Sequence, residues 1–394
     1  MILTEHPRPS HTFVHISDTH LPRERAPLYG SGTDADANLA LLLSRLVASG
    51  IRPDALLLTG DLADRGDASS YRRLRALIEP AAELLGCEVV WAAGNHDDRA
   101  AMRAELGVGA AAVGSVGADA TAMAGEASGG ASGGAEPGGA VPGGIASEGA
   151  VWDGAGSEAA ASGGAVSGGL AAGGAAVVGS PAWAASVSAV AAAAPSVADA
   201  GCLEGDAADA PITDPITEVR WFGGMRVIVL DSTVPGAHWG QVSEAQLSWL
   251  ARELSTPAPR GTLLLIHHPP LPTVLPLAVT VELRGQARLA EVVRGSDVRG
   301  ILSGHVHHPS FGMFAGIPVT VASSSAYGQD LSQPVGATRG QDAAQGYNLV
   351  QVYADTVVHS VVSLESGPDV GEPVGAEEAL ARIEGRGIGW RDWG

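Results

Sequence analysis

The chain has 394 residues, 45% of them hydrophobic, so it can bury the core of one large domain or of two smaller ones. It contains no lysine, and its 23 arginines are outnumbered by 43 acidic residues, which gives a formal charge of −20. This charge argues against sequence-independent binding to the phosphates of nucleic acids. Two cysteines are too few for a disulfide framework or a thiolate metal site, so any chemistry must use His, Asp and Asn side chains.

The segments that would direct a protein to a membrane are not found in the sequence. The start, MILTEHPRPSHTFVHISD, lacks the basic stretch followed by an apolar stretch that marks a secretory signal. No later segment is both long and apolar enough to cross a bilayer. We therefore expect a soluble, cytoplasmic protein without a membrane span.

Short apolar runs rich in β-branched residues alternate with amphipathic stretches. Strands are predicted at 12–17, 54–60, 87–94, 225–231, 261–267, 299–304, 317–323, 347–353 and 356–364. Helices are predicted at 36–48, 69–85, 243–254 and 282–293. The third helix has the clearest signal, because Ser243 and Gln246 form a Ser-x-x-Gln capping box. The alternation predicts an α/β protein whose sheets are covered by helices.

Between residues 107 and 218 the composition changes to Ala, Gly, Ser and Val with scattered Pro. Trp152 and Trp183 are the only aromatic residues there, and the span holds 12 acids and no basic residue. We interpret 107–218 as a disordered, low-complexity insert without chemistry, although 184–194 is Ala-rich enough for a transient helix. Residues 1–106 and 219–370 then form a single domain, followed by a C-terminal extension at 371–394.

Polar side chains gather directly after five of the predicted strands. They are Asp18 and His20, Asp61 and Asp64, Asn95 and His96, His267 and His268, and finally His305, His307 and His308. Each group alone has an ordinary explanation as a turn, a helix cap or a structural histidine. In α/β sheets, however, the loops after the carboxyl ends of strands converge on one crevice, so we expect the groups to meet in one site.

The pooled side chains offer hard oxygen and borderline nitrogen donors, which suit Mn, Fe, Zn or Co better than Ca or Cu(I). The set is too large for one ion. A bridging carboxylate would allow two ions about 3.5–4 Å apart, the arrangement that clamps the attacking and leaving oxygens in phosphoryl transfer. Two dications opposed by two carboxylates and a hydroxide leave a charge of about +1, which attracts a phosphate.

The sequence carries five motifs that resemble those of the calcineurin-like metallophosphoesterases, complete and in order. They are D-x-H at Asp18, G-D-x-x-D-R-G at Gly60, G-N-H-D at Gly94, H-H-P-P at His267 and G-H-V-H at Gly304. Stretches between them, such as VIVLDSTVPGAHWGQ, are similar to the actinobacterial class III cyclic nucleotide phosphodiesterases. The likeness covers nearly the whole chain except 107–218 and the last twenty or so residues. It implies a four-layer αββα sandwich with a metal site at one edge of the paired sheets.

The resemblance also implies a role for each motif residue. The first metal ion would be held by Asp18, His20, Asp61 and His307, and the second by Asp61, Asn95, His267 and His305. Asp61 would bridge the two ions. His96 would be catalytic, assisted by Asp64, and the substrate phosphate would be bound by His20, Asp61, Asn95, His96 and His307.

Five further side chains near the motifs have less definite expectations. His268 is expected to support the ligands without binding metal. Arg65 and Arg99 are expected to be surface charges more often than phosphate contacts. His238 and His308 are left open between solvent and substrate contact.

These inferences predict a phosphodiesterase with two transition metal ions, Fe and Mn first and Zn or Co as alternatives. The expected substrates are small phosphodiesters, 3′,5′-cAMP together with 2′,3′-cyclic nucleotides, attacked by a metal-bound hydroxide. The resemblance suggests a homodimer. A glycerophosphodiesterase or a nucleotide phosphatase is the alternative within the same fold. A signalling scaffold without catalysis is the alternative from another class, but a scaffold has no need of the complete ligand set.

Overall fold

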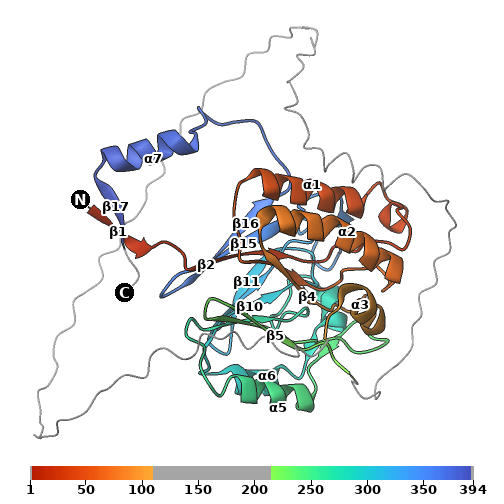
Figure 1. Cartoon of the computed structure of the whole chain (residues 1–394). Coiled ribbons are helices and arrows are strands. Elements are labelled where there is room, and N and C mark those ends of the chain that lie inside the picture. Colours follow the sequence, from red (N-terminus) through yellow and green to blue (C-terminus); the bar gives the residue numbers. More distant parts are fainter. Residues whose placement is uncertain (1, 110–213, 392–394) are drawn as a thin grey trace, which may run out of the picture. The chain divides into compact units, whose positions relative to one another are not determined.

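The computed structural model describes residues 2–109 and 214–391, and two β-sheets form the centre of this part of the chain (Figure 1). The first sheet consists of β2 (His11–Ile16), β3 (Ala55–Thr59), β4 (Glu88–Ala92), β15 (Gly346–Val352) and β16 (Val357–Ser363). Its order is β16-β15-β2-β3-β4, with β2, β3 and β4 parallel to one another. These three strands therefore end at the same edge of the sheet.

The second sheet has six strands with a parallel centre. It consists of β5 (Glu218–Phe222), β6 (Met225–Val229), β8 (Thr262–Leu265), β10 (Val298–Ser303), β11 (Ser310–Phe314) and β12 (Ile317–Val321). In the order β11-β12-β10-β8-β6-β5, the four central strands are parallel and the two edge strands are antiparallel to their neighbours. The ends of β8 and β10 lie next to each other.

Helices cover the outer face of each sheet. They are α1 (Ala35–Ala48), α2 (Ala68–Leu85), α3 (Arg99–Leu106), α5 (Glu244–Glu253) and α6 (Gln286–Val293). Leu42 of α1 and Ile78 of α2 belong to a buried cluster with Leu56 and Leu58 of β3. A second buried cluster joins α5 and α6 to β6, β8, β10 and β12. Figure 1 shows the two groups of helices on opposite sides of the paired sheets.

The two sheets pack face to face through the alternate side chains of their strands. Because successive residues of a strand point to opposite faces, Leu57 of β3 points away from α1 and α2. It lies in a third buried cluster with Val227 of β6, Leu263 of β8 and Leu302 of β10. The layers follow in the order helix, sheet, sheet, helix, which confirms the predicted α/β class and the four-layer αββα sandwich.

Several short elements complete the described residues. They are β1 (Ile2–Pro7), β7 (Gly240–Gln241), β9 (Leu283–Arg284), β13 (Gly328–Gln329), β14 (Gly340–Gln341), α7 (Ala376–Gly385), β17 (Ile388–Arg391) and the 3-10 helices Leu28–Gly30 and Pro276–Val281. β1 pairs in parallel with β17. α7 and β17 fall within the predicted C-terminal extension, 371–394.

All nine predicted strands and all four predicted helices occur in the structure. The helix predicted at 243–254 begins at its capping box, where Ser243 and Gln246 each bond to the backbone of the other. The helix predicted from 282 begins only at Gln286, because Leu283 and Arg284 pair as β9. In the part of the chain that the structure describes, no helix is long and apolar enough to cross a membrane.

The predicted insert, 107–218, lies outside the described residues except at its two ends. At those ends, Val108 and Ile216 are buried in the cluster between α1, α2 and the first sheet. The division into one domain, an insert and an extension stays a prediction.

Candidate metal centre

The predicted metal ligands all follow the carboxyl ends of parallel strands. They follow β2 (Asp18 and His20), β3 (Asp61), β4 (Asn95), β8 (His267) and β10 (His305 and His307). Three of these strands belong to the first sheet and two to the second. The face-to-face packing of the sheets therefore brings side chains from both onto one site, as the strand-end argument predicts.

Asp18, His20, Asp61 and His307 form a buried group whose potential ligand atoms all lie within 4.8 Å of one another. The Nε2 atoms of His20 and His307 are 3.0 Å apart. His20 Nε2 is 3.5 Å from Asp61 Oδ2, and His307 Nε2 is 3.4 Å from Asp18 Oδ1. His307 Nδ1 faces the carbonyl oxygen of Tyr327 at 3.2 Å and can donate to it, which leaves the Nε2 lone pair directed at the group.

His267 lies on the other side of Asp61. Its Nε2 is 3.4 Å from Asp61 Oδ2 and 3.2 Å from Asn95 Oδ1. Its Nδ1 donates to the carbonyl oxygen of Thr59 at 2.7 Å, so the Nε2 lone pair faces the two oxygens. The same Asp61 oxygen therefore approaches both His20 and His267, as a bridging carboxylate must.

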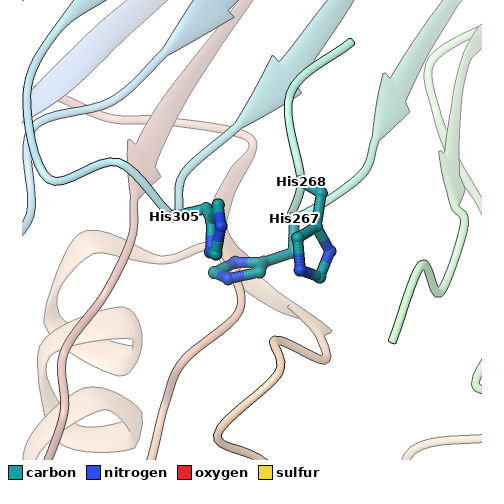
Figure 2. Close-up of side chains that lie close together, drawn as sticks. All are labelled: His267, His268 and His305. Atoms are coloured by element: carbon teal, nitrogen blue, oxygen red, sulfur yellow. The ribbon is translucent and has the colours of Figure 1, made fainter. Parts of the chain in front are cut away.

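His305 joins His267 and His268 in a group of three imidazoles (Figure 2). The ring centroids of His267 and His305 are 5.1 Å apart. His305 Nε2 donates to the carbonyl oxygen of Val281 at 2.9 Å, which leaves Nδ1 as the nitrogen that can bind a metal. Burial, together with the charge of His267, lowers the pKa of His305 to about 3, so its lone pair is available at neutral pH.

His268 is close to these ligands, but both of its nitrogens already have partners. Nδ1 is 2.8 Å from the hydroxyl of Ser232, and Nε2 donates to the carbonyl oxygen of His238 at 3.1 Å. Neither nitrogen is left for a metal ion, in agreement with the supporting role expected for His268.

Backbone strain is concentrated in the ligands. Nine residues other than glycine have a positive φ among those described, and five of them are predicted ligands. These five are Asp18 (φ 52°), His20 (41°), Asp61 (48°), His305 (76°) and His307 (55°). Such conformations cost on the order of 1–3 kcal/mol each and persist where the surrounding structure enforces them, which is common at functional sites.

Two motif glycines allow the strand ends to approach closely. A Cβ atom on Gly94 would lie 2.2 Å from the Asp61 backbone nitrogen, and one on Gly304 would lie 1.8 Å from Ser17 Oγ. Past Gly304, the backbone N–H of His305 donates to both carboxylate oxygens of Asp18, at 3.0 and 3.1 Å. Any larger residue would push the G-H-V-H loop away from Asp18.

The buried carboxylates are held ionised by the imidazoles. Burial alone would raise the pKa of Asp61, but His267 and His96 lower it well below its usual value. Burial also opposes ionisation of Asp18, but His307 brings its pKa to about 2. The pKa of His267 rises to about 9 despite burial, chiefly because of Asp61. The group thus requires positive charge at its centre.

The donor set fits a pair of metal cations. The Nε2 atoms of His20 and His307 are 3.0 Å apart, and each has a carboxylate oxygen, of Asp61 or Asp18, at 3.5 or 3.4 Å. These atoms direct their electron pairs into one small space, and only shared protons or a cation offset the repulsion between them. The second nitrogen of each of His267, His305 and His307 is bonded to a backbone carbonyl, the outer contact typical of metal-binding histidines. We conclude that these side chains can hold metal.

His96 lies next to the group of Asp18, His20, Asp61 and His307, and it forms a further group with His20 and Asp64 whose potential ligand atoms lie within 4.8 Å of one another. Its backbone N–H donates to Asp61 Oδ1 at 2.9 Å, and its Nδ1 donates to the backbone carbonyl of Asp64 at 2.7 Å. Its ring is 4.8 Å from that of His20. Burial would lower the pKa of His96, but Asp61 and the Asp64 carbonyl raise it above its usual value. Protonated His96 is therefore favoured.

Asp64 supports the site in two ways. Its backbone carbonyl positions His96, whereas its carboxylate faces His20, with Oδ1 3.4 Å from His20 Nδ1. The hydroxyl of Tyr29 donates to the same Oδ1 at 2.5 Å. Tyr29 lies in the short 3-10 helix Leu28–Gly30 and in no motif, so the sequence offered no signal by which it could have been identified.

The expectation that Arg99 is a surface charge is wrong. Its Nε is 2.7 Å from Asp231 Oδ2, and its side chain is only 11% exposed. It also donates to Thr233, so its guanidinium ties the start of α3 to the segment after β6. Arg65, by contrast, is 62% exposed, with Nε 3.8 Å from Asp64 Oδ2, as a surface charge would be.

Comparisons with known proteins agree with this geometry. A model of the calcineurin-like phosphoesterase family matches residues 11–137. Over 384 residues the chain is 41% identical to a cAMP/cGMP dual specificity phosphodiesterase of Mycobacterium tuberculosis, covering 98% of this chain and 89% of that protein. It is 40% identical over 384 residues to a probable cyclic nucleotide phosphodiesterase of Rhodococcus erythropolis, covering 98% and 94%.

A shorter match, 40% identical over 83 residues, covers 21% of this chain and 30% of a 3′,5′-cyclic adenosine monophosphate phosphodiesterase of Escherichia coli. Two relatives at 40% identity or more that span nearly the whole chain leave no ambiguity about descent. This chain belongs to the calcineurin-like phosphoesterase family.

Proposed function

We propose that this protein is a dinuclear metal-dependent phosphodiesterase that hydrolyses cyclic nucleotides. The observation that carries the proposal is the meeting of Asp18, His20, Asp61 and His307 within 4.8 Å, with His267 on the far side of the shared Asp61. This arrangement supplies two adjoining sets of ligands from motifs that lie far apart in the sequence.

The first set comprises Asp18, His20, Asp61 and His307, and the second comprises Asp61, Asn95, His267 and His305. The mixture of carboxylate, amide and imidazole donors supports Fe and Mn as the resident ions, with Zn or Co as alternatives. When bound, two such ions polarise the phosphate and activate the attacking water. The strained backbone and the hydrogen bonds at the outer nitrogens hold the ligands in place before the substrate arrives.

We assign His96 the role of proton donor to the leaving ribose oxygen. Its Nδ1–H is committed to the Asp64 carbonyl, so Nε2 is the atom that can transfer a proton. The shift of the His96 pKa above its usual value favours the protonated form that a proton donor requires. Asp64 assists through its carbonyl, and His20, Asp61, Asn95, His96 and His307 together surround the proposed position of the phosphate.

The shortage of fixed cations supports a diester substrate. A phosphodiester is a monoanion, whereas a monoester is close to a dianion at neutral pH and is usually held by additional Arg or Lys side chains. The chain has no lysine, Arg99 is paired with Asp231, and Arg65 is largely in solvent. The names of the two full-length relatives point to the same substrate class.

The test is an assay of Mn²⁺-loaded protein with 3′,5′-cAMP, 3′,5′-cGMP, 2′,3′-cyclic AMP, a glycerophosphodiester and 5′-AMP. We expect kcat/KM for at least one cyclic nucleotide to exceed that for 5′-AMP by about tenfold or more, roughly 1.4 kcal/mol in transition-state binding. Equal or faster hydrolysis of 5′-AMP would instead favour a nucleotide phosphatase. The cytoplasmic location and the homodimer stay predictions from the sequence.

A further inference from the structure

His238 lies in the loop between β6 and β7 and contacts a ligand of the second predicted metal ion. Its Nδ1 is 3.2 Å from the side-chain nitrogen of Asn95. The imidazole is exposed, and its centroid is 5.4 Å from that of His96. His238 belongs to none of the five motifs that define the site.

The contact with His238 selects one of the two orientations of the Asn95 amide. An amide nitrogen can only donate, so Asn95 Nδ2–H donates to Nδ1 of His238 in the tautomer that carries its proton on Nε2. In this orientation Asn95 Oδ1 faces His267 Nε2 at 3.2 Å, on the side of Asp61. The reversed amide would direct its N–H groups at the position of the cation, where they cannot serve as ligands.

The loop that carries His238 is itself firmly anchored. His268 donates from Nε2 to the His238 carbonyl oxygen, and its Nδ1 lies against Ser232. Gly240 packs so closely on His268 that a Cβ atom there would be 2.4 Å from the imidazole ring. At the start of the loop, the buried Asp231 accepts a hydrogen bond from Arg99. The backbone at His238 is thus held by contacts within the protein.

We propose that His238 is a positioning residue that holds the Asn95 amide with its oxygen toward the second metal ion. The inference rests on the proposed dinuclear site and adds a residue to it. Loss of the hydrogen bond frees the amide to rotate, so the second ion loses a preoriented ligand. The first ion, whose predicted ligands do not include Asn95, is unaffected.

The experiment measures metal occupancy in the absence of substrate. Full-length protein is dialysed against buffers of fixed free Mn²⁺ concentration, and bound Mn²⁺ per chain is determined. In His238→Ala we expect the free Mn²⁺ at which occupancy falls from two to one to rise roughly tenfold, the lower end of the range for outer-shell partners of metal ligands. The free Mn²⁺ at which occupancy falls from one to zero should change by less than about twofold.

Two further variants separate positioning from general damage to the loop. In His238→Gln the side-chain carbonyl can accept the same hydrogen bond, so we expect occupancy to return to within about threefold of the original protein. Gln241→Ala changes an exposed side chain of β7, directly after the loop, and should leave both steps in place. At saturating Mn²⁺, kcat of His238→Ala should recover to within about threefold of the unmodified protein.

Three results would overturn the proposal: unchanged occupancy in His238→Ala, an equal shift of both steps, or a His238→Gln variant as weak as His238→Ala. An unmodified protein that binds only one Mn²⁺ per chain would also refute it. Failure of the unmodified protein to hydrolyse any cyclic nucleotide would count against the proposed substrate and leave the occupancy measurement interpretable.

Discussion

Asp61 lies between the two sets of imidazoles, and its Oδ2 approaches both of them. The distances are 3.5 Å to His20 Nε2 and 3.4 Å to His267 Nε2. Its other oxygen accepts the backbone N–H of His96 at 2.9 Å. One carboxylate thus contacts both ligand sets and the proposed proton donor, so a single substitution there tests the whole arrangement.

Asp61→Asn should reduce bound metal below two ions per chain and abolish hydrolysis, because the amide lacks the charge that bridges two cations. Metal analysis and the cyclic nucleotide assay are the measurements. Asp36→Asn is the matched control, since Asp36 is buried but bonded to Arg73 outside the site. Full activity of Asp61→Asn with two bound ions would show that the bridge is wrongly assigned.

His96→Ala tests the difference between a ligand and a proton donor. His96 contacts Asp61 through its backbone, which the substitution preserves, so about two metal ions should remain bound. We expect kcat to fall by roughly 10²–10⁴-fold, the usual contribution of a positioned proton donor. A parallel loss of metal would instead identify His96 as a ligand.

At the scale of elements, the site depends on how closely the end of β10 approaches the end of β2. Gly304 follows β10, and a Cβ atom there would overlap Ser17 Oγ and lie 2.5 Å from Asp18 Oδ2. The His305 N–H bonds to Asp18 form directly beyond this contact. The spacing of the two strand ends therefore determines whether ligands from the two sheets meet.

Gly304→Ala should separate the strand ends and misplace His305 and His307. We expect a loss of stability of about 1–3 kcal/mol from overpacking, together with weaker metal binding, measured by urea unfolding and metal analysis. Gly367→Ala serves as the control, because a Cβ atom on Gly367 would meet nothing within 4 Å. Normal metal content in Gly304→Ala would show that this close approach is not required.

At the scale of the whole molecule, the paired sheets enclose two histidines that are not part of the metal site. Burial lowers the pKa of His15 to about 3 and that of His359 to about 4. His15 on β2 bonds to Thr59 Oγ1 at 2.8 Å, while both ring nitrogens of His359 on β16 are buried without a partner. Both side chains therefore stay neutral in the folded protein.

These histidines predict a loss of stability in mild acid. Their folded pKa values lie below the unfolded value of about 6.5, so the unfolded chain takes up protons first as the pH falls. Stability is then complete above about pH 6.5 and decreases toward pH 4. At pH 5 the protonation of His15 in the unfolded chain lowers the free energy of unfolding by about 2 kcal/mol. In His359→Leu, the free energy of unfolding measured with urea should fall less between pH 7.5 and pH 5 than in the original protein. An equal fall would contradict the assignment.

The strands and helices of the interior were predictable because their sequence patterns are local. In both sheets, the strand sequences either alternate between apolar and polar residues or are apolar over several consecutive residues. Helix α5 begins at a capping box that spans only four positions. The elements that were missed lie at the edges. β5 and β11 are half-exposed hairpin strands, and α3 and α7 are short helices with few buried side chains. Their positions depend on neighbours distant in the sequence.

The sequence alone determined the family and the layers of the fold and predicted a set of side chains for the site, because these depend on motifs at strand ends and on residue chemistry. Only the tertiary structure decided which atoms face one another. Arg99 is bound by Asp231, Tyr29 by Asp64, and Asn95 by His238. In each pair at least one residue, namely Asp231, Tyr29 or His238, lies in a segment without a motif. Such pairings depend on the packing of two sheets and their loops in three dimensions. No local pattern records them, because the interacting residues are separated by between 35 and 143 positions along the chain.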